Sequence, residues 1–382
     1  MYITRKIEKE IKTLAQEFPI VVLMGPRQSG KTTLVKRLFK KYQYVSLEDT
    51  RVRQMAQDDP EGFFQKYSSQ VIIDEMQRVP ELFSYLQTHS DDLNKTGQFI
   101  ITGSQNYLLM ENITQSLAGR VGLATLLPFA YEEIEKFSKN EDTDTLLFEG
   151  FYPRKKVQKI RTPQFYSAYV RTYLERDVRD LVNIKDVDNF VKFMTVLAGR
   201  TGQILKITEL ANECEISRET VNRWLNILET SFIVYRLRPY HKNYKKQIIK
   251  APKIFFYDTG LVCHLLGITT VEQLKNFYLK GSLFETLVVS EFLKNNFNMG
   301  SFIKFFYWRD KSGKEIDLIT EENLTITTME IKSAKSVRSE FFKNLDYFAR
   351  QAGNNKLIKK LIYDGRESYK SQGVQILNWR EI

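Results

Sequence analysis

The sequence predicts an α/β protein in which a parallel sheet precedes a mainly helical segment and a second, smaller α/β unit. Short apolar runs alternate with helix-like stretches over roughly residues 19–135, a pattern typical of a parallel sheet. The pattern becomes mostly helical over 164–232, and from about 281 a helix is followed by strands. We therefore expect three domains, over residues 1–150, 151–280 and 281–382.

The first element expected is an amphipathic helix over residues 1–17, where apolar residues recur at helical spacing. The apolar run Pro19–Met24 follows, bounded by proline and glycine, and it predicts a buried strand. Three similar runs predict further strands of the sheet, with helices between them. The expected strands cover 44–47, 71–73 and 99–101, and the expected helices cover 32–41 and 80–93.

Composition limits the class of protein. The 382 residues include 57 Lys and Arg against 46 Asp and Glu, and the net charge of +11 favours a polyanionic partner such as DNA. The two cysteines, Cys214 and Cys263, exclude a disulfide framework and a cysteine metal cluster. No run approaches the roughly 18 apolar residues of a membrane span. We expect a cytoplasmic protein without a membrane partner.

Residues 25–32 read GPRQSGKT and match G-x-x-x-x-G-K-[ST] between a strand and a helix. The glycines let backbone N–H groups face phosphate oxygens, and the helix adds its N-terminal partial charge. Lys31 is expected to reach the β- and γ-phosphates, and the Thr32 hydroxyl to ligate Mg²⁺. ATP and Mg²⁺ are therefore the predicted cofactors. The predicted nucleotide contacts are Gly25, Pro26, Arg27, Gln28, Ser29, Gly30, Lys31, Thr32 and Thr33, with Asp74 and Ser104 from later in the chain.

Two acids follow the apolar strand at 71–73. Asp74 lies at its carboxyl end, where α/β sheets place their sites, and can hold Mg²⁺ through water. Glu75 is placed to act as the base that orients the attacking water. Glu75, Lys31 and Arg120 form the predicted catalytic set.

Two further polar positions are less specific. The strand at 99–101 ends in small polar residues, of which Thr102, Ser104 or Gln105 could sense the γ-phosphate, or simply end the strand. Arg120 precedes another apolar run and could be an arginine finger for a neighbouring subunit's nucleotide, or a surface arginine. The finger hypothesis implies a homo-oligomer.

Residues 207–228 have the proportions of a helix-turn-helix, with Ser217 suited to cap the second helix. The basic stretch over 236–253 is interpreted as a β-wing. Such a winged helix could contact DNA, or serve only as a packing or protein-contact module. The residues available for DNA are Arg218, Asn222 and Arg223 on the helix, and Lys242, Lys245 and Lys246 near the wing tip.

The C-terminal part carries the order E…D…ExK on a helix and two strands. Glu285, Asp317, Glu330 and Lys332 in this order resemble the PD-(D/E)xK nuclease core. Asp317 and Glu330 could hold one divalent metal, Lys332 could help to activate water, and Glu285 could complete the cluster through water. The pattern leaves open whether the domain cleaves or only binds.

Ordered motifs along the chain resemble the widespread bacterial and archaeal AAA-type ATPases with an uncharacterised C-terminal domain. The motifs include GPRQSGKTTL (25–34), VIIDEMQRVPELF (71–83), SLAGRVGLATLLPFAYEE (116–133), YPR (152–154) and GSLFETLVVSEF (281–292). The resemblance implies a P-loop NTPase, a winged-helix segment and a restriction-endonuclease-like domain. Two functions stay open: an ATPase whose nucleotide state controls nucleic-acid engagement, or an oligomeric switch that presents an inactive C-terminal domain to a protein partner.

Overall fold

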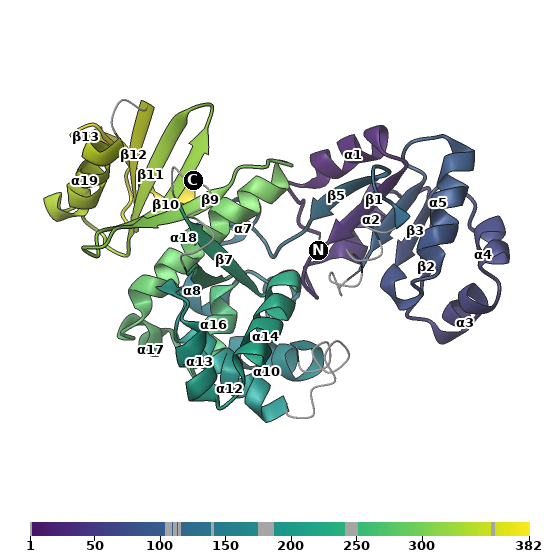
Figure 1. The fold of residues 1–382 in the computed structure, drawn as a ribbon, viewed down its shortest axis with the longest axis horizontal. Coiled ribbons are helices and arrows are strands. Elements are labelled where there is room, and N and C mark those ends of the chain that lie inside the picture. The colour runs from purple at the N-terminus through teal and green to yellow at the C-terminus, as the bar shows by residue number, and fades with distance from the viewer. Residues whose placement is uncertain are drawn as a thin grey trace.

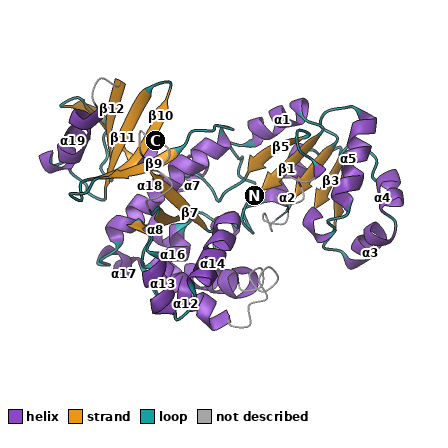
Figure 2. Cartoon of the chain, in the orientation of Figure 1, coloured by secondary structure: helices purple, strands orange, loops and turns teal. Residues whose placement is uncertain are grey.

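The computed structural model describes residues 2–103, 109, 113, 116–138, 141–174, 187–240, 251–352 and 356–382, with Tyr173 and Leu174 described by their backbone alone. The chain forms a sheet with flanking helices, a mainly helical region and a second sheet with helices (Figure 1, Figure 2). The expected mixed α/β chain with a parallel sheet is confirmed. Among the described residues, no helix combines the length and the hydropathy needed to cross a membrane.

The N-terminal sheet contains five parallel strands in the order β2-β3-β4-β1-β5. Each apolar run forms a strand within a residue or two of its expected place, because the residues of β1, β3 and β4 are buried on both faces. The strands are β1 (Ile20–Met24), β2 (Gln43–Ser46), β3 (Val71–Asp74), β4 (Phe99–Thr102) and β5 (Val121–Thr125).

Helices cover both faces of this sheet. Along β1, Val21 packs on the face of the first two helices, whereas Val22 packs on the face of the next three. The expected N-terminal helix begins only at Glu8, and the residues before it run along the domain as an irregular segment. The helices are α1 (Glu8–Glu17), α2 (Lys31–Leu38), α3 (Thr50–Asp58), α4 (Pro60–Lys66) and α5 (Leu82–Leu93), with the short η1 (Met76–Arg78) after β3.

The middle region is mainly helical, as expected, and packs around an aromatic core that includes Tyr166, Phe193 and Trp224. Helices α13 and α14 form a helix-turn-helix, which three short antiparallel strands flank. The helices are α7 (Tyr131–Ser138), α8 (Thr143–Glu149), α9 (Pro153–Gln158), α10 (Thr162–Tyr169), η2 (Val170–Leu174), α12 (Val187–Ala198), α13 (Ile207–Cys214), α14 (Arg218–Thr230), α16 (Thr259–Leu265) and α17 (Val271–Lys275). The strands are β6 (Gln203–Ile204), β7 (Val234–Pro239) and β8 (Lys253–Phe256).

The C-terminal region continues this second sheet to nine strands, in the order β13-β14-β12-β11-β10-β9-β7-β8-β6. Arg238 of β7 pairs with Phe306 of β9, so backbone hydrogen bonds cross the boundary expected near residue 280. The elements are α18 (Lys280–Asn298), β9 (Phe305–Arg309), β10 (Glu315–Glu322), β11 (Thr325–Lys332), η3 (Ser339–Phe342), α19 (Lys343–Ala352), β12 (Lys356–Tyr363), β13 (Tyr369–Ser371), β14 (Val374–Asn378) and η4 (Trp379–Glu381). The domain boundaries at 150 and 280 stay predictions.

Candidate functional site

The loop between β1 and α2 has the backbone that a phosphate cradle requires. Gly25 has φ +146°, and a Cβ there would lie 2.1 Å from the carbonyl oxygen of Leu126. Gly30 has φ +94° and immediately precedes the first residue of α2. Only glycine meets both conditions without strain, so the glycine spacing in the sequence reflects local geometry.

Lys31 is the first residue of α2, and its side chain folds back into this loop. Its buried Nζ donates to the carbonyl oxygens of Gly25 and Pro26, at 2.9 Å each. Nearby, Gln28 Oε1 and Ser29 Oγ are buried and have no hydrogen-bond partner among the residues that the structure describes. An ammonium group and polar side chains thus line the turn, as phosphate binding would require.

Asp74 meets Thr32 at the carboxyl end of β3. Its Oδ2 accepts hydrogen bonds from Thr32 Oγ1 at 2.9 Å and from the Tyr44 hydroxyl at 2.8 Å. Its Oδ1 accepts from the hydroxyl of Thr102 on the neighbouring β4. Burial and the Asp74 charge raise the pKa of Tyr44, so this hydroxyl keeps its proton. The threonine–aspartate contact fits Mg²⁺, because hydroxyl and carboxylate oxygens are ligands that Mg²⁺ prefers.

Glu75 follows in a strained conformation, with φ +59°. Its N–H donates to the carbonyl of Thr102 at 2.8 Å, which fixes the turn after β3. The buried Gln77 donates from Nε2 to the Glu75 carboxylate, and a Cβ at Gly103 would lie 2.4 Å from Gln77 Oε1. Sequence reasoning missed Gln77, although the residue belongs to the motif at 71–83 and lies two positions after Glu75.

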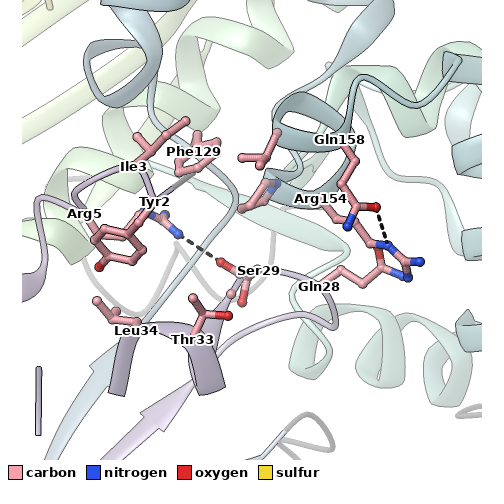
Figure 3. A pocket seen from close by; sticks show the side chains of 13 residues that line it. Tyr2, Ile3, Arg5, Gln28, Ser29, Thr33, Leu34, Phe129, Arg154 and Gln158 are labelled. Carbon is pink, nitrogen blue, oxygen red and sulfur yellow. Dashed lines mark hydrogen bonds between the residues drawn. The ribbon is translucent and has the colours of Figure 1, made fainter. Parts of the chain in front are cut away.

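A cavity of about 340 Å³ adjoins the loop (Figure 3). Tyr2 and Phe129 contribute aromatic rings to its lining, and Leu34 and Val157 contribute apolar side chains. Arg154, on α9, also lines the cavity, and its Nε donates to Gln158 Oε1 at 3.2 Å. These residues were not predicted, because four segments far apart in sequence meet only in the fold. The motifs at 25–34, 116–133 and 152–154 contain Leu34, Phe129 and Arg154 but gave these residues no role.

Arg120 does not lie beside the loop of its own chain. It precedes β5, and because the strands are parallel, this end is at the opposite edge of the sheet from the loop. Its Nε pairs with Asp91 Oδ1 at 2.6 Å. This bond raises the pKa of Arg120 and lowers that of Asp91. A finger role therefore requires a second chain, and it stays a prediction. Ser104 and Gln105 lie outside the described residues.

The helix-turn-helix presents its expected polar residues to solvent. Ser217 Oγ accepts the N–H of Thr220 at 3.0 Å and caps α14, as expected. Arg218, Asn222 and Arg223 are exposed along α14. The two ends of the basic stretch interpreted as a wing belong to β7 and β8, which pair antiparallel, and the winged helix stays a prediction. Lys242, Lys245 and Lys246 lie outside the described residues.

The E…D…ExK residues meet in one charged cluster. Lys332 Nζ contacts Glu330 Oε2 at 2.5 Å and Asp317 Oδ2 at 3.3 Å, and Asp317 also accepts the N–H of Ile331 at 2.8 Å. Glu330 Oε1 is buried without a hydrogen-bond partner in the described structure. The fold thus brings Asp317, Glu330 and Lys332 into contact, and their metal-binding and nuclease roles stay predictions.

A second lysine, Lys253 of β8, enters the same cluster. Its buried Nζ pairs with Glu285 at 2.9 Å and with Glu315 at 2.5 Å. Both Lys253 and Glu315 were missed. Glu315 lies two residues before Asp317 on one strand, so period-two alternation could have placed them on one face. Nothing local marked Lys253, which is 32 residues from Glu285.

Burial and mutual repulsion perturb this cluster. Burial raises the pKa of Glu285 to about 7, against the attraction of Lys253, and burial with the charge of Asp317 raises the pKa of Glu330 to about 8. Although burial opposes it, Lys332 and Lys253 hold the pKa of Asp317 below its usual value. Within the described ranges, no group of three or more histidine, cysteine or acidic side chains converges to hold a metal.

Comparisons with known proteins divide the chain into three parts. An AAA domain matches residues 17–135, and two domains of unknown function, DUF8612 and DUF4143, match 140–272 and 280–382. The uncharacterized protein Rv2008c of Mycobacterium tuberculosis is 30% identical over 309 residues, which cover 79% of this chain and 68% of that protein. The chain belongs to the family of this mycobacterial protein. It carries an AAA-type domain with the phosphate loop of P-loop ATPases.

Two more distant likenesses extend along much of the chain. The uncharacterized protein MJ1544 of Methanocaldococcus jannaschii is 25% identical over 349 residues, or 82% of this chain and 74% of that protein. The Walker-type ATPase PABY2304 of Pyrococcus abyssi is 14% identical, with a TM-score of 0.49, over 68% of this chain and 94% of that chain.

Proposed function

We propose that the protein is a Mg²⁺-dependent ATP hydrolase whose nucleotide state controls engagement of nucleic acid by its helix-turn-helix and C-terminal domain. The observation that carries the proposal is the 2.9 Å contact between Thr32 Oγ1 and Asp74 Oδ2 beneath the glycine loop. Thr32 and Asp74 would hold the cation. When bound, Mg²⁺ would neutralise charge on the β- and γ-phosphates.

The remaining residues of the site have distinct roles. Lys31 would exchange its two backbone carbonyl partners for phosphate oxygens. Glu75, held by Gln77, would accept a proton as water attacks the γ-phosphorus and the bond to the ADP oxygen breaks. The aromatic cavity beside the loop would hold the base, and Arg154 on α9 could reach the phosphates from within the same chain.

Nucleic-acid engagement is supported by charge and exposure. The chain has a net charge of +11, and Arg218 and Arg223 project from the second helix of the helix-turn-helix. We interpret this region as a winged helix. In the C-terminal cluster, Asp317 and Glu330 would hold a divalent cation together with substrate phosphates, since Mg²⁺ commonly uses one or two carboxylates plus phosphate oxygens.

One observation favours the second function, an oligomeric switch with an inactive C-terminal domain. Lys253 and Lys332 supply positive charge inside the cluster, so each of its four carboxylates has an internal counter-ion beside it. A protein partner would then bind the surface of the C-terminal domain.

Salt-dependent DNA binding tests the two functions against each other. The first predicts binding of duplex DNA that weakens steeply between 50 and 200 mM salt, on the order of tenfold or more for several phosphate contacts. Arg223→Ala should reduce that slope, whereas Lys12→Ala on the distant α1 should not. Absence of binding at low salt, with and without ATP, would contradict the first function and leave the switch.

A further inference from the structure

A chain of buried contacts leads away from the phosphate loop, and Arg5 begins it. Arg5 is only 5% exposed. Its Nη1 donates to the carbonyl oxygen of Ser29 in the loop at 2.9 Å, and its Nη2 to that of Leu127 at 2.7 Å. Its Nε pairs with Glu133 Oε1 at 3.0 Å, and its guanidinium lies 4.7 Å from the centre of the Phe129 ring (Figure 3).

Glu133 continues the chain to the start of α7. Its side chain is fully buried, and Oε2 accepts the N–H of Ala130 at 2.9 Å. The next amide, of Tyr131, donates to Glu291 Oε2 on α18 at 2.7 Å. Glu291 also pairs with Lys294 at 2.8 Å, and both side chains are buried. Helices α7 and α18 lie between the two sheets in Figure 1. These contacts therefore connect the AAA-type domain to the C-terminal region.

The contact between Arg5 and Ser29 fixes the orientation of an amide in the loop. The carbonyl of Ser29 and the N–H of Gly30 belong to one planar, trans peptide unit, so they point in opposite directions. By holding the Ser29 oxygen, Arg5 fixes where the Gly30 N–H points. A phosphate that accepts the Gly30 N–H would shift this peptide unit, and the shift would alter the hydrogen bond between the Ser29 oxygen and Arg5.

The last contact reaches the C-terminal cluster. Glu285 lies on α18, upstream of Glu291, and pairs with Lys253 of β8. A helix is a rigid element, so a displacement at Glu291 is transmitted to Glu285.

We propose that Arg5 is a positioning residue of the nucleotide site, and that the chain Arg5–Glu133–α7–Glu291 couples nucleotide binding to α18. The coupling deepens the proposed function and rests on ATP binding at the loop. It supplies the route by which the nucleotide state would reach the C-terminal domain.

Binding of a non-hydrolysable ATP analogue to the full chain tests the positioning role. Arg5→Ala removes two charge-assisted bonds to backbone carbonyls and should weaken affinity about tenfold or more. Arg5→Lys can restore one of these bonds and should recover part of the loss. Lys12→Ala is the matched control, because Lys12 is an exposed cation on α1. Circular dichroism confirms that each variant is folded.

Hydrogen exchange of α18 amides with and without the analogue tests the coupling. In the unchanged protein the analogue should alter exchange over Lys280–Asn298. Glu133→Gln should remove at least half of that change, because the single oxygen of the glutamine amide cannot accept from both Arg5 and the Ala130 N–H. Glu132→Gln should leave the change in exchange intact. No analogue binding to the unchanged protein overturns the nucleotide site and the coupling together. Binding with no change in α18, or equal changes in all variants, overturns the coupling alone, and unaltered affinity of Arg5→Ala overturns the positioning role.

Discussion

Replacing Lys253 with methionine should selectively destabilise the sheet that joins the middle and C-terminal regions. Lys253 is 3% exposed and is the shared partner of Glu285 and Glu315. Removing one member of a buried ion pair costs about 3–5 kcal/mol, because the remaining charge is left unpaired. The side chains of Glu285 and Glu315 are 15% and 22% exposed, so the lower value applies. A loss of about 3 kcal/mol corresponds to roughly a 150-fold fall in protection from exchange.

Hydrogen exchange is the suitable assay, since a chain of several domains does not unfold in one step. Protection factors for β8 and β10 amides would be compared between the unchanged protein and Lys253→Met. Lys206→Met is the matched control, because Lys206 forms an exposed pair with Glu209, worth at most about 0.5 kcal/mol.

The loss should also depend on pH. The pKa of Glu285 is raised from 4.5 to about 7, so between these values the folded state binds more protons than the unfolded state, and stability falls as pH rises. Without Lys253 that pKa rises further, and the fall extends to higher pH. The variant should therefore lose more protection at pH 9 than at pH 6. A loss below about 1 kcal/mol, or one independent of pH, would refute the argument from a buried ion pair.

Three further outcomes are expected. Glu75→Gln should bind ATP but turn it over about 100-fold more slowly, because the amide cannot accept a proton; a steady-state phosphate assay with undiminished turnover would move the base elsewhere. Arg120→Ala should lower turnover only in an oligomer, and mixing it with Glu75→Gln protein should restore some activity, whereas purely additive loss would count against a finger in trans. Asp317→Ala and Glu330→Ala should each abolish Mn²⁺ binding at the C-terminal cluster, measured by calorimetry in a Lys31→Ala background, and should leave ATP turnover unchanged when Lys31 is present. If the folded Lys31→Ala protein with Asp317 and Glu330 intact gave no heat on addition of Mn²⁺, that metal site would be ruled out.

The sequence predicted those features that depend on local pattern. Apolar runs located the strands of the first sheet because buried parallel strands need continuous apolar residues. The glycines of the loop and the position of Asp74 after β3 could be predicted because a sequence motif and the end of an apolar strand are both local features of the sequence. The E…D…ExK order also predicted that Asp317, Glu330 and Lys332 lie close together.

Features assembled from distant segments could not be found in this way. Tyr2 and Arg154 share a cavity although about 150 residues separate them, and periodicity carries no information on such contacts. Lys253 stood in a basic stretch that suggested a solvated wing, yet the fold buries it among carboxylates. The helix expected over residues 1–17 begins only at Glu8. The residues before it lie against the phosphate loop and α7, where Arg5 contacts Ser29 and Glu133.

The central claim is that the glycine loop binds and hydrolyses ATP. Phosphate release by the full chain in ATP and Mg²⁺ measures it directly, for the unchanged protein, for Lys31→Ala, and for Lys40→Ala, whose lysine is exposed just beyond α2. We expect turnover that Lys31→Ala lowers at least about 100-fold and Lys40→Ala leaves within twofold, because the Lys31 side chain, and not that of Lys40, reaches into the loop. Equal turnover in all three proteins would contradict it.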